Sequence, residues 1–93
     1  MTTFVDAVEA VYALRVADWG VTVGEPYVSS DGREDAEGYL VVWGAREYLL
    51  DGNLDYALVN GTVTFVSRAT GAIRDELMIL NFDKVDAMTR VSA

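Results

Sequence analysis

The fold is decided by residues 54–80, which have the sequence LDYALVNGTVTFVSRATGAIRDELMIL. Asn60-Gly61 lies between two runs with alternating apolar residues. Asn-Gly is the strongest short-range signal for a two-residue type I′ turn, because both central residues must accept positive φ. The later segment 67–71, Ser-Arg-Ala-Thr-Gly, predicts a second turn. We therefore expect two consecutive β-hairpins in an antiparallel sheet.

The Asn-Gly turn also predicts the register of the first hairpin. Pairing Val59 with Thr62 places Tyr56 opposite Phe65 on one face of the sheet. That face is expected to be core, and the opposite face mostly exposed to solvent. The strand after the second turn is expected to twist or bulge at Asp75-Glu76.

The composition indicates one compact domain. The chain has 93 residues, of which 52% are hydrophobic, and a single proline, so we expect one α+β domain over residues 1–93. It has no cysteine, which excludes disulfides and thiolate metal sites and favours the reducing cytoplasm. No apolar run approaches the ~20 residues that span a bilayer, and the beginning of the sequence does not have the pattern of a signal peptide. We expect a cytoplasmic protein with no membrane contact.

The charge is strongly acidic: 7 basic and 15 acidic residues give a net charge of −8, with no histidine. This field would repel a phosphate backbone, whereas nucleic-acid-binding proteins present a basic patch. A basic protein would instead be attracted, and its association would be accelerated by long-range steering. Acidity that only keeps a small domain soluble is the alternative explanation. We expect a basic protein partner and no nucleic acid.

An amphipathic helix is predicted near the start of the chain. Thr3 is suited to cap it, with Asp6 as the acidic partner at the third helical position. Gly20 is a plausible C-terminal cap, and Trp19 could anchor that end in the core. Apolar residues recur at spacings of three and four through about residue 17. They are Phe4, Val5, Val8, Val11, Tyr12 and Leu14.

Further strands follow this helix. Residues 21–28 predict a strand interrupted at Pro26, and residues 30–37 predict a polar, acidic turn. Residues 38–43 (Gly-Tyr-Leu-Val-Val-Trp) have no charge and predict a central strand packed on both faces. Residues 44–53 fit either a helical turn or a strand, and residues 82–91 fit a short helix capped by Asn81 or Asp83. The predicted fold is α+β, an N-terminal helix packed on a four- to five-stranded antiparallel sheet.

The sequence has few residues of the types that carry out catalysis. Without His or Cys the usual nucleophile and base pairs cannot be assembled, and Lys84 is the only lysine. Glu34, Asp35 and Glu37 are close in sequence, but a solvated turn would not separate their pKa values as an acid/base pair requires. We expect no catalytic residue and no enzymatic activity.

A partial calcium motif begins at Asp51. Asp51-x-Asn53-x-Asp55 matches the first three ligand positions of a calcium loop, but the glycine position holds Tyr56 and the bidentate glutamate position holds Thr62. We expect turn chemistry here, and no metal or cofactor.

The residues suited to a protein partner are acidic or aromatic. The acidic turn would steer the partner, and aromatic residues at the rim would anchor it. The predicted partner-binding residues are Asp31, Glu34, Asp35, Glu37, Trp43 and Tyr48.

Over residues 4–80 the order of motifs resembles the YrhB-like family, also described as immunity protein 35 of bacterial toxin-immunity systems. The similar features are the N-terminal helix, the strand 38–43, the Tyr-Leu-x-x-Gly turn at 48–52, and the strand that ends in Thr70-Gly71. The chain differs from the family in having Asn60-Gly61-Thr62-Val63 in place of Gly-Asn-x-Pro, and Ser67 in place of Asp. A strand followed by Thr-Gly is also similar to inhibitory modules of peptidase propeptides.

The resemblance implies an immunity-like inhibitor of a toxin or of a host protein, which binds its target without catalysis. The alternative is a phage or bacterial structural or assembly protein that forms homo-oligomers through its sheet. A small-molecule site would need a deep pocket, which a domain of this size scarcely provides.

Overall fold

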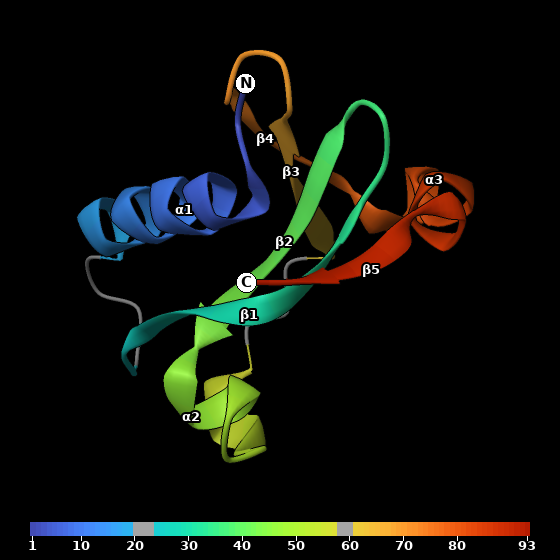
Figure 1. Cartoon of the computed structure of the whole chain (residues 1–93). Coiled ribbons are helices and arrows are strands. Elements are labelled where there is room, and N and C mark those ends of the chain that lie inside the picture. The colour runs from blue at the N-terminus through green and yellow to red at the C-terminus, as the bar shows by residue number, and fades with distance from the viewer. Residues whose placement is uncertain (20–23, 58–60) are drawn as a thin grey trace.

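The computed structural model describes residues 1–19, 24–57 and 61–93. It contains a five-stranded antiparallel sheet of order β4-β3-β2-β1-β5, with α1 on one face and α3 on the other (Figure 1). The predicted α+β class is confirmed. The elements are α1 (Phe4–Asp18), β1 (Pro26–Glu34), β2 (Gly38–Ala45), α2 (Arg46–Leu49), η1 (Leu54–Tyr56), β3 (Thr62–Ser67), β4 (Ile73–Leu77), η2 (Met78–Leu80), α3 (Phe82–Ala87) and β5 (Thr89–Ser92).

Helix α1 begins as its sequence predicts. The Thr3 hydroxyl accepts a hydrogen bond from the Asp6 amide, and the Asp6 carboxylate accepts one from the Thr3 amide, so the capping box is complete. The buried stripe differs in part from the predicted one: it consists of Phe4, Ala7, Val11 and Arg15. The expected core residues Val5, Tyr12 and Leu14 are exposed. The proposed cap at Gly20 lies outside the described residues.

Strand β2 is the centre of the molecule, as predicted. Because successive strand residues point to opposite faces, it contributes to two cores. Tyr39 and Val41 pack under α1, and Leu40 packs on the α3 side. The other buried residues of the α1 core are Phe4, Ala7, Val11, Val28 and Val66. The other buried residues of the α3 core are Val63, Phe65 and Met88.

The prediction of the first hairpin is wrong. Residues 54–56 form the 3₁₀ helix η1, and Phe65 pairs with Leu40 of β2 and Arg74 of β4 rather than with Tyr56. Leu58, Val59 and Asn60 lie outside the described residues. Strand β3 gains a ladder on each side by lying between β2 and β4, and it buries both of its faces there. This long-range pairing outweighs the local preference for an Asn-Gly hairpin.

The second hairpin is confirmed. Val66 pairs with Ile73, the Gly71 amide donates to the Ser67 carbonyl at 2.8 Å, and Gly71 has φ +75°. The expected bulge at Asp75-Glu76 is absent, because β3 and β4 pair without a break in register.

The remaining predictions hold in part. The first strand is not interrupted at Pro26: β1 begins there, and its irregularity falls between Val28 and Gly32. Residues 21–23 of the expected strand lie outside the described residues. Residues 30–34 belong to β1, so only residues 35–37 form the acidic turn. Residues 46–49 are helical. Helix α3 is present in the tail, but the Asn81 side chain donates back to the Leu77 carbonyl instead of capping it. The strand β5 was not expected.

Candidate protein-binding surface

The acidic turn at the tip of the β1–β2 hairpin is tied to α3. The Lys84 ammonium lies 3.1 Å from an Asp35 carboxylate oxygen and 3.3 Å from one of Glu37. Arg68 lies 3.6 Å from Glu34 and donates to the Asp35 carbonyl. The turn is therefore a structured cluster of ion pairs rather than a freely solvated run of charge.

These contacts set the pKa values of the Asp35–Lys84 pair. Burial raises the pKa of Asp35, but the hydrogen bonds from Lys84 and from the Gly38 and Glu37 amides outweigh it, so the pKa lies below its ordinary value of 3.8. Burial lowers the pKa of Lys84, but the hydrogen bonds to Asp35 and Glu37 raise it by more. The pKa of Lys84 therefore lies above its ordinary value of 10.5.

Substitution of Lys84 should therefore change the acid stability of the protein. The ionised Asp35 stabilises the fold above its unfolded pKa, and this contribution is lost as pH falls through the lower, folded pKa. In Lys84→Met the fall in unfolding free energy between about pH 5 and about pH 2 should be smaller than in the parent chain. Urea denaturation at several pH values across that range measures the free energy of unfolding. Arg90→Met is the matched loss of one positive charge and should leave the pH dependence unchanged; an equal effect of both variants contradicts the assignment.

Asp31 lies further along β1, where its carboxylate accepts a hydrogen bond from the Ser92 hydroxyl of β5 at 2.6 Å. Asp31 pairs with Ser92, and Glu34 pairs with Thr89 at the other end of this short ladder. The four predicted acidic residues thus lie along one hairpin, each in contact with another element or with its own turn.

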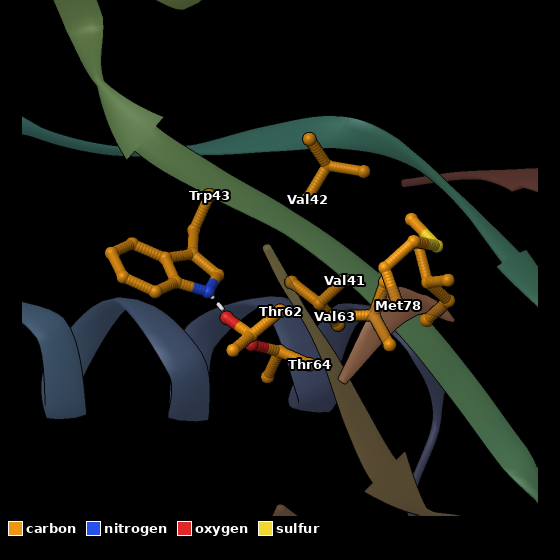
Figure 2. A pocket seen from close by; sticks show the side chains of 8 residues that line it. Val41, Val42, Trp43, Thr62, Val63, Thr64 and Met78 are labelled. Carbon is orange, nitrogen blue, oxygen red and sulfur yellow. Dashed lines mark hydrogen bonds between the residues drawn. The ribbon is translucent and has the colours of Figure 1, made fainter. Parts of the chain in front are cut away.

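Trp43 is partly buried between α1 and the sheet. Its indole N–H donates to the Thr64 hydroxyl at 2.7 Å (Figure 2). The Arg15 guanidinium lies 4.0 Å from its ring centroid, and the Trp19 ring meets it edge-on at 6.4 Å. Arg15 also donates to Thr64 and to Asp75. These contacts give Trp43 a structural role, in which it joins α1 to the sheet.

A small pocket opens beside Trp43. The pairing of β2 with β3 ends at Val41 and Thr64, although β2 continues to Ala45, and the pocket of about 210 Å³ lies where the two strands separate. Its lining is uncharged and mostly apolar, so it offers no group for acid/base or anion chemistry. The lining residues are Leu40, Val41, Val42, Trp43, Thr62, Val63, Thr64 and Met78, drawn in Figure 2.

Tyr48 is in α2 and is 38% exposed. Helix α2 follows β2 at the end opposite the hairpin tip (Figure 1). The structure therefore does not bring the six predicted residues into one surface: the acidic residues lie along the hairpin, and Trp43 and Tyr48 lie toward the other end of β2.

The sequence interpretation missed an exposed apolar segment that starts at Leu77, the last residue of β4. Within six positions, four large apolar side chains are more than half exposed: Leu77 52%, Ile79 73%, Leu80 77% and Phe82 56%. The sequence signal was the unbroken run Leu-Met-Ile-Leu at 77–80. It was interpreted as part of the last strand, whereas the strand ends at Leu77 and the run turns into η2.

This apolar segment leads directly into the acidic region. Helix α3 begins at Phe82, carries the exposed Asp83 and Asp86, and contacts the hairpin tip through Lys84. We call the four apolar residues together with Asp83 and Asp86 the η2–α3 surface. It combines apolar anchors with neighbouring negative charge, an arrangement suited to protein recognition.

Comparison of the chain with family models, curated proteins and solved structures finds no match. Among residues 1–19, 24–57 and 61–93, no group of three metal-ligating side chains is present. In the same part of the chain, no helix is long and apolar enough to cross a membrane. Function is therefore inferred from the chemistry of the described surface.

Proposed function

We propose that this chain is a small, acidic, non-enzymatic binding protein of the cytoplasm, an immunity-like inhibitor that covers a basic surface of a toxin or a host protein. The observation that carries the proposal is the exposed apolar segment that leads into α3, the helix whose Lys84 contacts the acidic turn. Large apolar side chains exposed next to one another are characteristic of interaction sites. The net charge of −8 favours a basic partner, and the resemblance to the YrhB-like family supports an immunity role.

The structural features of the hairpin fit a binding role better than a catalytic one. Asp35 and Glu37 share Lys84, and Glu34 faces Arg68. Such pairs orient the turn, and they leave the exposed Glu37 able to attract a cation on a partner. A proton-transfer role would need a carboxyl whose pKa is close to neutral, whereas the pKa of Asp35 is lowered.

Co-expression with the protein encoded by the adjacent gene tests this proposal. We expect that protein to arrest growth when it is expressed alone, and this chain to relieve the arrest by forming a stable complex with it. Absence of relief together with absence of a complex at low salt would overturn the proposal.

The kinetics of such a complex should depend on exposed acidic side chains. The triple variant Glu37→Gln, Asp83→Asn, Asp86→Asn should slow association by about tenfold at low ionic strength and change dissociation little, because steering acts before contact. Stopped-flow association across a salt series measures this. Neutralising Glu9, Asp51 and Asp55, which lie elsewhere, is the matched control; equal slowing in both variants would show that only total charge matters.

The assembly alternative has one observation in its favour, since β4 and β5 are edge strands. However, the centre of β4 carries Arg74, Asp75 and Glu76, and β5 has only four residues; charged and very short edge strands oppose pairing between copies. The negative charge of each copy opposes self-association further. Inhibitory binding of a basic protein is therefore the better-supported function.

A further inference from the structure

We infer that the η2–α3 surface is the docking site for a basic, amphipathic protein segment, whose apolar side chains cover Leu77, Ile79, Leu80 and Phe82. This inference rests on the proposed binding function and names the surface and the chemistry of the partner.

The first argument is exposure without a structural reason. Ile79 and Leu80 are 73% and 77% exposed, although Met78, the residue directly before them, packs against the α3 core. The same short turn thus has one residue that anchors it to the domain and two that point to solvent. Apolar residues exposed singly are common in proteins, whereas adjacent ones at this level of exposure mark an interaction site.

The second argument is that the segment is held in place. The Met78 amide donates to the Gly61 carbonyl at 2.9 Å, and the Asn81 amide donates to the Met78 carbonyl at 2.9 Å. The Asn81 side chain donates to the Leu77 carbonyl at 2.7 Å. Because these bonds fix the backbone around Ile79 and Leu80, binding there would lose little conformational entropy.

The third argument is charge. Asp83 and Asp86 form no ion pair within the described part of the chain, whereas the only lysine, Lys84, is already shared by Asp35 and Glu37. Glu76, just before the apolar segment, is paired with Arg74. The guanidinium of Arg33 also reaches α3, where it donates to the Val85 carbonyl. The two exposed carboxylates outnumber this one cation, so lysine or arginine on a partner would be favoured there.

This charge also decides between possible occupants. A second copy would bring the same carboxylates and a net charge of −8 against this surface. The outer face of α1 also has an apolar stripe, but its members Val5, Tyr12 and Val16 are only 46–49% exposed, less than each of the four apolar residues of the η2–α3 surface. A basic, amphipathic segment on the η2–α3 surface would cover its apolar side chains and pair with its carboxylates.

The test uses a defined probe, a synthetic peptide of about 14 residues with leucine at helical spacing and lysine elsewhere. A scrambled peptide of the same composition, without an apolar face, is its control. Heteronuclear NMR titration of the full chain should shift the amides of residues 77–86 with the first peptide, at an affinity at least tenfold above the scrambled one. The double variant Ile79→Ser/Leu80→Ser should weaken binding by about tenfold or more. Leu54→Ser, also at a residue 77% exposed, should leave it unchanged.

Three outcomes would overturn the inference. They are equal affinity for both peptides, equal weakening by Leu54→Ser, and a concentration-dependent dimer in light scattering that Ile79→Ser/Leu80→Ser abolishes, which would make a second copy the occupant. Because both positions are exposed, the double variant should fold normally, and thermal unfolding checks this. If a complex with the product of the adjacent gene persists in the double variant, the docking site fails while the proposed function stands; if no such complex forms with the parent chain, the proposed function fails.

Discussion

Gly38→Ala is expected to abolish most of the stability of the domain. A Cβ atom at this position would lie 2.0 Å from the Val66 carbonyl oxygen, 3.0 Å from its carbon and 3.1 Å from the Arg68 amide nitrogen. All three are backbone atoms, of β3 or of the residue that follows it, so a side-chain rotation cannot relieve the clash. We expect a loss of about 3–5 kcal/mol, which is large beside the roughly 5–10 kcal/mol net stability of a small domain. Urea denaturation followed by tryptophan fluorescence measures it.

Gly44→Ala is the matched control, because it lies in the same strand. There the three atoms nearest to the new methyl group would all belong to the Leu49 side chain, at 3.6 Å or more, which is ordinary contact. Neither glycine has a positive φ, so the two substitutions differ in space and not in backbone conformation. We expect Gly44→Ala to change stability by less than about 1 kcal/mol. Equal losses in the two variants would contradict the predicted close approach of β2 and β3.

Asp75→Asn has the second largest expected effect. Asp75 accepts hydrogen bonds from the Arg15 guanidinium at 2.6 Å and from the Thr64 hydroxyl. Arg15 is 7% exposed and its Nε has no hydrogen-bond partner among the described residues, so the buried cation depends on this carboxylate. Loss of one partner leaves a buried charge uncompensated. The Asp75 side chain is 42% exposed, so water screens part of the interaction. We therefore expect Asp75→Asn to lower the free energy of unfolding by about 2 kcal/mol, as measured by urea denaturation.

A double variant separates the effect of the ion pair on stability from nonspecific destabilisation. Arg15→Met/Asp75→Asn removes the buried cation together with its partner and keeps an apolar chain against Trp43. It should be more stable than Asp75→Asn alone, because no uncompensated charge remains. Additive losses from the two single substitutions would show that the pair is not coupled.

Sequence predicted the parts of this fold that local chemistry controls. The Thr3–Asp6 capping box is a contact between residues three apart, and the turn ending in Thr70-Gly71 closes a hairpin between adjacent strands. The central strand was recognisable because an uncharged β-rich run is suited to burial on both faces. Each of these predictions needs no knowledge of distant residues.

The failures involve contacts between distant residues. The Asn60-Gly61 signal favoured a local hairpin, but β3 pairs with β2, more than twenty residues earlier. Arg15 was not expected in the core, because its partners Thr64 and Asp75 are 49 and 60 residues away. The contacts of Trp43 with Thr64 and Arg15, which join the sheet to α1, are also between residues far apart in the sequence.

The candidate surface was partly predictable. The acidic residues at the hairpin tip were recognised from their composition, but their ion pairs with Lys84 and Arg68 come from elements far along the chain. The apolar run at 77–80 was visible in the sequence. Only the end of β4 at Leu77 shows that this run leaves the sheet and that Ile79 and Leu80 face solvent.

Hydrogen–deuterium exchange tests the central claim most directly, with the chain alone and bound to the protein encoded by the adjacent gene. The account predicts that binding slows exchange in residues 77–86 and in the hairpin tip at 35–37, and leaves α2 and the outer face of α1 unchanged. Slower exchange confined to α1 or to α2 and η1, with residues 77–86 unaffected, would contradict it.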